Sequence, residues 1–233
     1  MINPKELLLM REREIIRLIS LIKNLAPPYI IVGGYAVATI MKRFSVDLDI
    51  VIKKENEEEF KKILEKEGYK QSYSKEISTI YGENFIRLEK KINNLPICID
   101  FMINGLVSRS TDASWSFEYI NKNSEIRNIE NIQFIVPTKE LLIAMKLHSG
   151  RISDTKDIVA LSKNTDVETI LSHVLRGKTE KLKTNAKISL DYIKSKNFKD
   201  SFQGIFGIKA YQEELLAKSE EIFNSVISQQ ISI

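Results

Sequence analysis

Apolar positions follow two different periods along the chain, and the change from one to the other marks the predicted elements. Helical spacing comes first and predicts a helix from Pro4 to about Asn24, capped by Asn3. Short apolar runs bounded by turn residues then predict strands at 29–32, 48–53, 69–77, 84–91 and 96–103, with helices at 35–41 and 55–68. Short turns between the later strands favour antiparallel pairs in a mixed sheet over a doubly wound parallel one.

Beyond the strands the pattern becomes mostly helical. A short helix ending near Tyr119 and two strands, 125–129 and 133–136, precede Pro137, and helices are predicted at 138–148, 154–162, 167–177, 180–196 and 210–229. Gly204 and Gly207 predict a loop before the last of these helices. The expected fold class is therefore α+β, with a mixed β-sheet flanked by helices in a domain of residues 1–137 and an α-helical C-terminal domain of residues 138–233.

Composition restricts the class of protein. The 233 residues are 43% hydrophobic, which suits a globular core, and Cys98 is the only cysteine, so an internal disulfide is excluded. No apolar run reaches the length of a membrane span. We expect a cytoplasmic protein without a membrane partner. The formal net charge of +4 is compatible with an RNA partner but does not demonstrate one.

Two carboxylates on one strand are the most informative chemical feature. In Asp47-Leu48-Asp49-Ile50 the two acids alternate with apolar residues, so they lie on one face of the strand while Leu48 and Ile50 enter a core. Adjacent carboxylates repel each other and are expected to share a cation. Oxygen ligands of this kind suit Mg²⁺ or Mn²⁺.

Gly33-Gly34 supplies the second feature, because it ends the apolar run 29–32 just before a predicted helix. Glycines at a strand-to-helix turn allow a ligand to approach the backbone, and free amides at a helix start favour a phosphate. A third carboxylate is expected from Asp100, the only charged residue between Lys91 and Arg109. An acid within so apolar a run is costly to bury unless it is paired or bound to metal.

Taken together, a strand ending in Gly33-Gly34, a short helix and Arg43-x-Ser45-x-Asp47-x-Asp49 resemble the signature of the DNA polymerase β-like nucleotidyltransferases. The pattern is most similar to the AbiEii-type toxins and related uncharacterised branches. The resemblance implies catalysis and metal binding by Asp47, Asp49 and Asp100, and nucleotide binding by Gly33, Gly34, Arg43 and Ser45. It implies Mg²⁺ or Mn²⁺ as the cofactor and an NTP as the substrate.

A second stretch matches the AbiEii-like pattern after Pro137. The resemblance implies that Lys146 contacts the nucleotide phosphates, that Arg151 supports the site, and that Asp157 braces the helical domain against it. Arg43 has an alternative role as a structural ion-pair partner. One departure concerns the toxins, many of which have Lys directly before the glycine pair, where this chain has Val32.

The implied function is transfer of a nucleoside monophosphate from an NTP to a hydroxyl acceptor. An RNA end such as that of tRNA is one acceptor, and a toxin would have a cognate antitoxin as partner. Two other readings stay open: a protein- or drug-modifying nucleotidyltransferase, and a non-catalytic nucleotide- or partner-binding module of a toxin-antitoxin or defence system.

Overall fold

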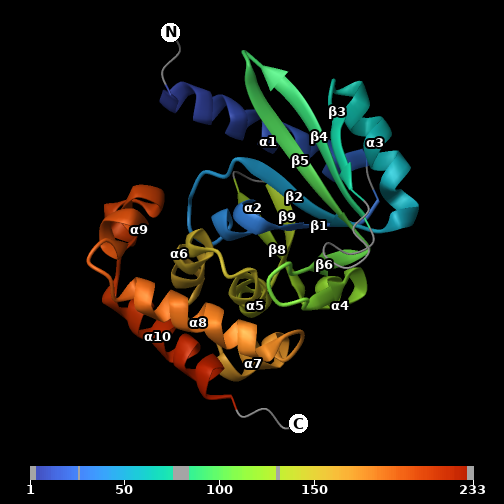
Figure 1. The fold of residues 1–233 in the computed structure, drawn as a ribbon. Helices are drawn as coiled ribbons and strands as arrows, with labels where there is room; N and C mark the ends of the chain where they lie inside the picture. Colours follow the sequence, from blue (N-terminus) through green and yellow to red (C-terminus); the bar gives the residue numbers. More distant parts are fainter. Residues whose placement is uncertain (1–3, 26, 76–83, 130–131, 230–233) are drawn as a thin grey trace.

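A computed structural model describes residues 4–25, 27–75, 84–129 and 132–229 (Figure 1). The first half of the chain contains α1 (Pro4–Leu25), β1 (Tyr29–Val32), α2 (Gly33–Ala38), β2 (Asp47–Ile52), the 3₁₀ turn η1 (Lys54–Asn56), α3 (Glu57–Lys66), β3 (Lys70–Lys75), β4 (Asn84–Ile92) and β5 (Leu95–Ile103). Three short strands and a helix follow: β6 (Gly105–Val107), β7 (Ser114–Ser116), α4 (Phe117–Lys122) and β8 (Ser124–Ile129). After β9 (Ile132–Pro137) come α5 (Lys139–Ser149), α6 (Ile152–Leu161), α7 (Val167–Val174), α8 (Thr179–Ile193), α9 (Phe198–Phe206), the 3₁₀ turn η2 (Ile208–Ala210) and α10 (Glu213–Ser228).

The central sheet has the strand order β1-β2-β5-β4-β3. β2 and β5 are parallel, and the other neighbouring strands are antiparallel, so the predicted mixed sheet and α+β class are confirmed. Asn93 and Asn94 join β4 to β5 with positive φ angles of 50° and 64°. A two-residue turn of this kind matches the twist of the strands and fixes their register. It places Arg87 directly opposite Asp100.

One face of the sheet is mainly apolar and packs against α1 and α3. Leu48, Ile50 and Phe101 are fully buried there, together with Ile15 and Leu18 of α1 and Phe60 of α3. The alternation of side chains along a strand explains this face, because Leu48, Ile50 and Phe101 point away from the face that carries the carboxylates of β2 and β5. The predicted core role of Leu48 and Ile50 is confirmed.

The opposite face of the sheet is divided into an apolar and a polar half. Val51 and Met102, near the carboxyl ends of β2 and β5, pack in a second cluster with Trp115 of β7 and Leu141 and Met145 of α5. Towards the amino ends of the same strands the equivalent positions are occupied by Asp47, Asp49, Cys98 and Asp100. The polar half is therefore the natural place for chemistry.

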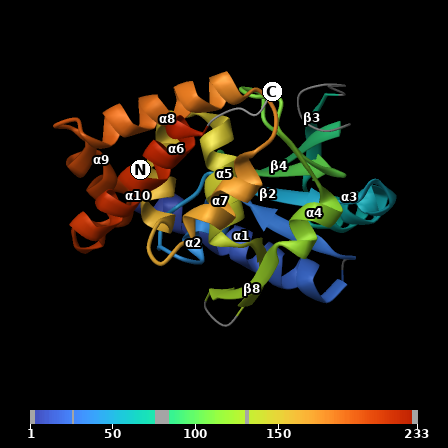
Figure 2. The same cartoon turned by 90° about the horizontal axis from the view of Figure 1, so that it is seen from below.

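The helices after Pro137 pack below the sheet in Figure 1, and Figure 2 shows α8, α6 and α5 side by side from the second direction. The hydrophobic core is continuous between the two parts, since one cluster contains Ile50, Leu147 and Phe223. The loop predicted at Gly204 and Gly207 is correct at Gly207, which ends α9 with a φ of 89°, but wrong at Gly204. Phe198, Phe202 and Phe206 stack at helical spacing and form α9 around that glycine.

Among the described helices, none has the length and hydropathy required to cross a membrane.

His148 is buried where α5 meets α7 and the loop before β7. Its Nε2 lies 2.9 Å from the Val174 carbonyl and its Nδ1 lies 2.7 Å from the Thr111 hydroxyl. Because a carbonyl can only accept, Nε2 carries the proton and Nδ1 accepts from Thr111. Burial, with the nearby charge of Arg176, lowers the pKa of His148 from 6.5 to about 4. The imidazole is neutral in the folded protein.

The neutral state of His148 makes the free energy of unfolding depend on pH. As pH falls from 7 to 5, the imidazole of His148 becomes protonated in the unfolded chain but stays neutral in the folded protein. The free energy of unfolding is therefore expected to fall by about 2 kcal/mol over this range. Urea titrations of the wild type and of His148→Gln across this range measure the effect. The variant is expected to lose this part of the slope. Equal slopes in the two proteins would show that His148 is not held neutral.

Candidate active site

β2 places two carboxylates beside two different neighbouring strands. Asp49 is paired in register with Val32, the last residue of β1, and with Asp100 of β5. Asp47 lies two residues earlier on the same face, opposite Cys98, and its side chain is 34% exposed. The strand order therefore brings the three acids that the sequence singles out to adjacent positions on one face of the sheet.

The Gly33-Gly34 turn lies against these carboxylates. Gly33 has a φ of +63°, which disfavours any residue with a side chain, and a Cβ added there would overlap the Asp49 carboxylate. A Cβ on Gly34 would overlap the hydroxyl of Ser45. Both glycines are thus required by close approach of the backbone to β2 and to the segment before it. Their contact with a nucleotide phosphate stays a prediction.

Gly33→Ala is expected to lower the free energy of unfolding by about 1–3 kcal/mol and to displace Asp49, because the methyl group needs both a strained φ and the space of the carboxylate. Gly204→Ala is the matched control. Gly204 lies within α9, and apart from the backbone of its own helix no heavy atom of the described residues lies within 4 Å of the position its Cβ would take, so a small gain of about 0.5–1 kcal/mol is expected. Thermal unfolding of the two variants measures the contrast, and equal stabilities would contradict it.

Arg87 of β4 belongs to this site, although it is not among the candidate residues predicted from the sequence. Its Nε lies 2.7 Å from Oδ1 of Asp100 and its Nη2 lies 2.6 Å from Oδ2 of the same carboxylate. The same Nη2 is 3.5 Å from Oδ2 of Asp47. A bidentate pair of this kind is both directional and strong. The guanidinium therefore lies between the carboxylates of β5 and β2.

The electrostatics of the site are those of crowded acids. Burial, reinforced by the neighbouring Asp100 carboxylate, raises the pKa of Asp49 to about 7. Burial also raises the pKa of Asp100, although Arg87 opposes the rise. Lys146 and Arg151 lie close enough to Asp49 to favour its charged form. The three carboxylates thus carry more negative charge than the neighbouring cationic side chains neutralise, and a bound cation would reduce their mutual repulsion.

Next to the carboxylates of β2 and β5, a second group of charged side chains links α5 to α6. The Lys146 ammonium is buried and lies 2.6 Å from Oδ1 of Asp154 and 2.8 Å from Oδ2 of Asp157. Arg151 adds a contact of 2.7 Å from its Nε to Asp154. Burial alone would raise the pKa of Asp154, but Lys146 and Arg151 lower it to about 2. Asp154 is a member of this network that sequence reasoning missed.

Arg43 connects this network to the segment that precedes β2. Its Nη1 makes an ion pair with Asp157, and its Nε donates to the Phe44 carbonyl over 3.2 Å. Ser45, two residues later, lies with its hydroxyl 3.3 Å from the Asp47 carbonyl. Asp157 thus ties α6 to the approach to Asp47, as a bracing residue would. In this structure Arg43 is an ion-pair partner, and Lys146 is engaged by two carboxylates.

The donor set suits a divalent cation only in part. Asp47 and Asp49 offer two oxygen ligands on one face, and Mg²⁺ is usually held by one or two carboxylates together with substrate phosphates. Asp100 has both oxygens occupied by Arg87. Within the described ranges, no three His, Cys, Asp or Glu side chains converge closely enough to hold a metal ion. Asp47 and Asp49 are thus the candidate ligands, and Asp100 would act as a third in competition with Arg87.

Comparison with known proteins identifies similar folds among solved structures. No protein-family model and no curated protein matches the sequence. Among solved structures, a proposed nucleotidyltransferase from H. pylori aligns over 97% of this chain and 96% of its own, with a TM-score of 0.52 and 17% identity.

Two further solved structures align less well. A proposed nucleotidyltransferase from Thermotoga maritima aligns over 67% of this chain and 91% of its own (TM-score 0.44, 18% identity). The antibiotic-resistance factor ANT(2'')-Ia aligns over 74% of this chain and 91% of its own (TM-score 0.48, 14% identity). On the strength of the H. pylori structure, which matches nearly end to end, this chain has a nucleotidyltransferase fold.

Proposed function

We propose that the protein is a metal-dependent nucleotidyltransferase, which moves a nucleoside monophosphate from an NTP to a hydroxyl group and releases pyrophosphate. One observation carries the proposal. Asp47, Asp49 and Asp100 lie in adjacent register positions on one sheet face, beside a glycine turn that is packed against Asp49. Carboxylates placed next to a glycine turn at the start of a helix are suited to a triphosphate with its metal.

Each residue would contribute positioning or charge. Asp47 and Asp49 would hold Mg²⁺ or Mn²⁺, and the metal would neutralise charge on the phosphates and on the leaving pyrophosphate. Gly33 and Gly34 would let the triphosphate approach the backbone next to Asp49. Asp100 would supply the third carboxylate and accept the proton of the attacking hydroxyl, a role that its raised pKa favours.

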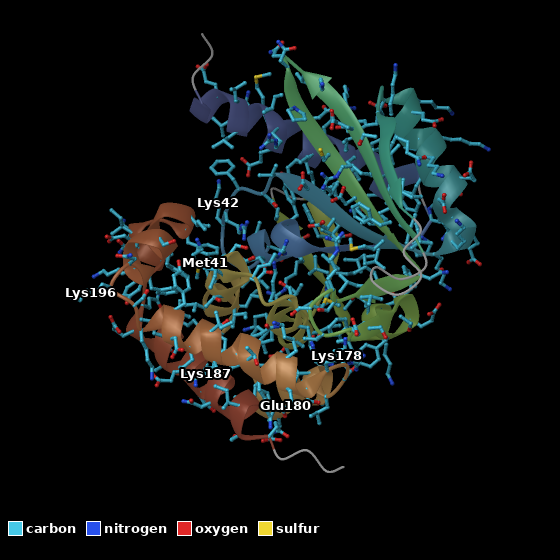
Figure 3. The ribbon with its side chains drawn as sticks, in the orientation of Figure 1. Met41, Lys42, Lys178, Glu180, Lys187 and Lys196 are labelled. Atoms are coloured by element: carbon cyan, nitrogen blue, oxygen red, sulfur yellow. The ribbon has the colours of Figure 1, made fainter. Side chains whose placement is uncertain are left out.

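A basic stretch supports an RNA end, such as that of tRNA, as the acceptor. From Arg176 to Lys199 the chain has eight lysine or arginine residues and two acids, so this stretch alone carries more positive charge than the net +4 of the whole protein. Lys178, Lys187 and Lys196 are exposed along α8 and its flanks (Figure 3). Lysines arranged along one helix are suited to phosphate contacts.

Labelled NTPs incubated with the protein, Mg²⁺ or Mn²⁺, and either total RNA or a protein extract test this function. The proposal expects label in RNA, dependent on the metal, on a free 3′ end and on Asp47, and weakening steeply as salt rises. Robust labelling of protein in place of RNA would overturn the RNA acceptor. Label in neither pool, together with no binding of metal or NTP, would overturn the enzyme and favour a non-catalytic partner-binding module, for instance one half of a toxin-antitoxin complex.

A further inference from the structure

Arg87 occupies the position between two carboxylates that a metal would share. Its guanidinium uses both oxygens of Asp100 at 2.7 and 2.6 Å and reaches Oδ2 of Asp47 at 3.5 Å. The two-residue turn at Asn93-Asn94 holds β4 and β5 in the register that places Arg87 opposite Asp100. The contact is therefore built into the hairpin.

The two partners differ in their freedom to move. The Asp100 side chain is 6% exposed, whereas the Arg87 side chain is 34% exposed. Asp100 projects from a central strand, but the long arginine side chain can reach solvent from its place on β4. Any rearrangement that frees the Asp100 oxygens must therefore come from Arg87.

We propose that Arg87 is a resident counter-ion that competes with the divalent cation for Asp100 and Asp47, and that moves to the triphosphate when the nucleotide arrives. This inference rests on the proposed function. A metal that takes Asp100 as a ligand leaves the guanidinium without a partner, and the triphosphate oxygens are the anions that replace it. Metal and nucleotide then favour each other's binding, because each removes a cost that the other would face alone.

Mn²⁺ binding in the absence of nucleotide, followed by electron paramagnetic resonance at pH 8, tests this role without an activity assay. Arg87→Gln is expected to bind Mn²⁺ about tenfold more tightly than the wild type, because the competing charge is gone. The same variant is expected to bind a non-hydrolysable NTP with Mn²⁺ about tenfold more weakly. Arg87→Lys keeps the charge but loses the two-pronged contact, so its Mn²⁺ affinity should lie between the two.

Arg127→Gln is the matched control, since Arg127 is also 34% exposed and lies 2.6 Å from a carboxylate, that of Glu125 on β8. It is expected to leave Mn²⁺ and NTP affinities unchanged. Circular dichroism shows whether each variant folds, and Arg87→Lys provides the result if Arg87→Gln does not. Arg87 variants that match the wild type in Mn²⁺ affinity would overturn the competition while leaving the proposed function intact. A wild type that binds no Mn²⁺ even in the presence of the non-hydrolysable NTP, as is expected of Asp47→Asn, would overturn the proposed function itself.

Discussion

Replacing Asp49 with Asn is expected to reduce nucleotide transfer about a thousandfold or more, equivalent to about 4 kcal/mol of transition-state stabilisation. The substitution removes one of the two carboxylates that fit the cation. It also removes a charge that burial and Asp100 disfavour, so the melting temperature in the presence of a chelator should be unchanged or higher. Initial rates of transfer and thermal melts without metal measure the two effects.

Asp112→Asn is a suitable control for Asp49→Asn, because Asp112 is 46% exposed and pairs with Lys178 away from β2. It should leave both the transfer rate and the melting temperature close to those of the wild type. If Asp49→Asn instead caused a large loss of stability without metal and left NTP affinity unchanged, Asp49 would be a structural residue.

Lys146→Met is expected to lower the free energy of unfolding by about 3–5 kcal/mol, because it leaves Asp154 and Asp157 buried without the ammonium they share. Lys178→Met is the control. Its ammonium is 68% exposed and lies 2.6 Å from Asp112, and an exposed pair contributes about 1 kcal/mol or less. Urea unfolding of the two variants measures the difference.

The same variant distinguishes the two roles of Lys146. The resemblance implies contact with the nucleotide phosphates, whereas the structure engages the ammonium with two carboxylates. A stable Lys146→Met protein with a greatly weakened affinity for NTP would support the phosphate contact. A destabilised protein whose folded fraction still binds NTP normally would establish the ion-pair role.

The strands and their faces were predictable because alternation is a local property. The strand at 29–32 matches β1 at both ends, and the alternating acids of β2 lie on the predicted face. The position of Asp100 beside Asp49 also followed, since an acid within an apolar run has few other uses. These features depend on a few neighbouring residues, and the sequence displays them directly.

The partners of the acids could not be predicted in the same way. Arg87 lies opposite Asp100 because the Asn93-Asn94 turn sets the register of β4 and β5, and the predicted strands at 84–91 and 96–103 came without a predicted turn type or register. Asp154 pairs with Lys146 across two helices whose packing no periodicity reveals. α9 was missed for another reason. Gly204 was read as a loop residue, although the phenylalanines around it have helical spacing.

The most direct test of the central claim compares NTP labelled at the α-phosphorus with NTP labelled at the γ-phosphorus, in the presence of Mg²⁺ and total RNA. Nucleotidyl transfer at Asp47 and Asp49 predicts that the α-label enters the acceptor, that the γ-label leaves as pyrophosphate, and that both Asp47→Asn and Asp49→Asn abolish the two signals. Transfer of the γ-label to the acceptor, or α-label transfer that survives both substitutions, would contradict the claim.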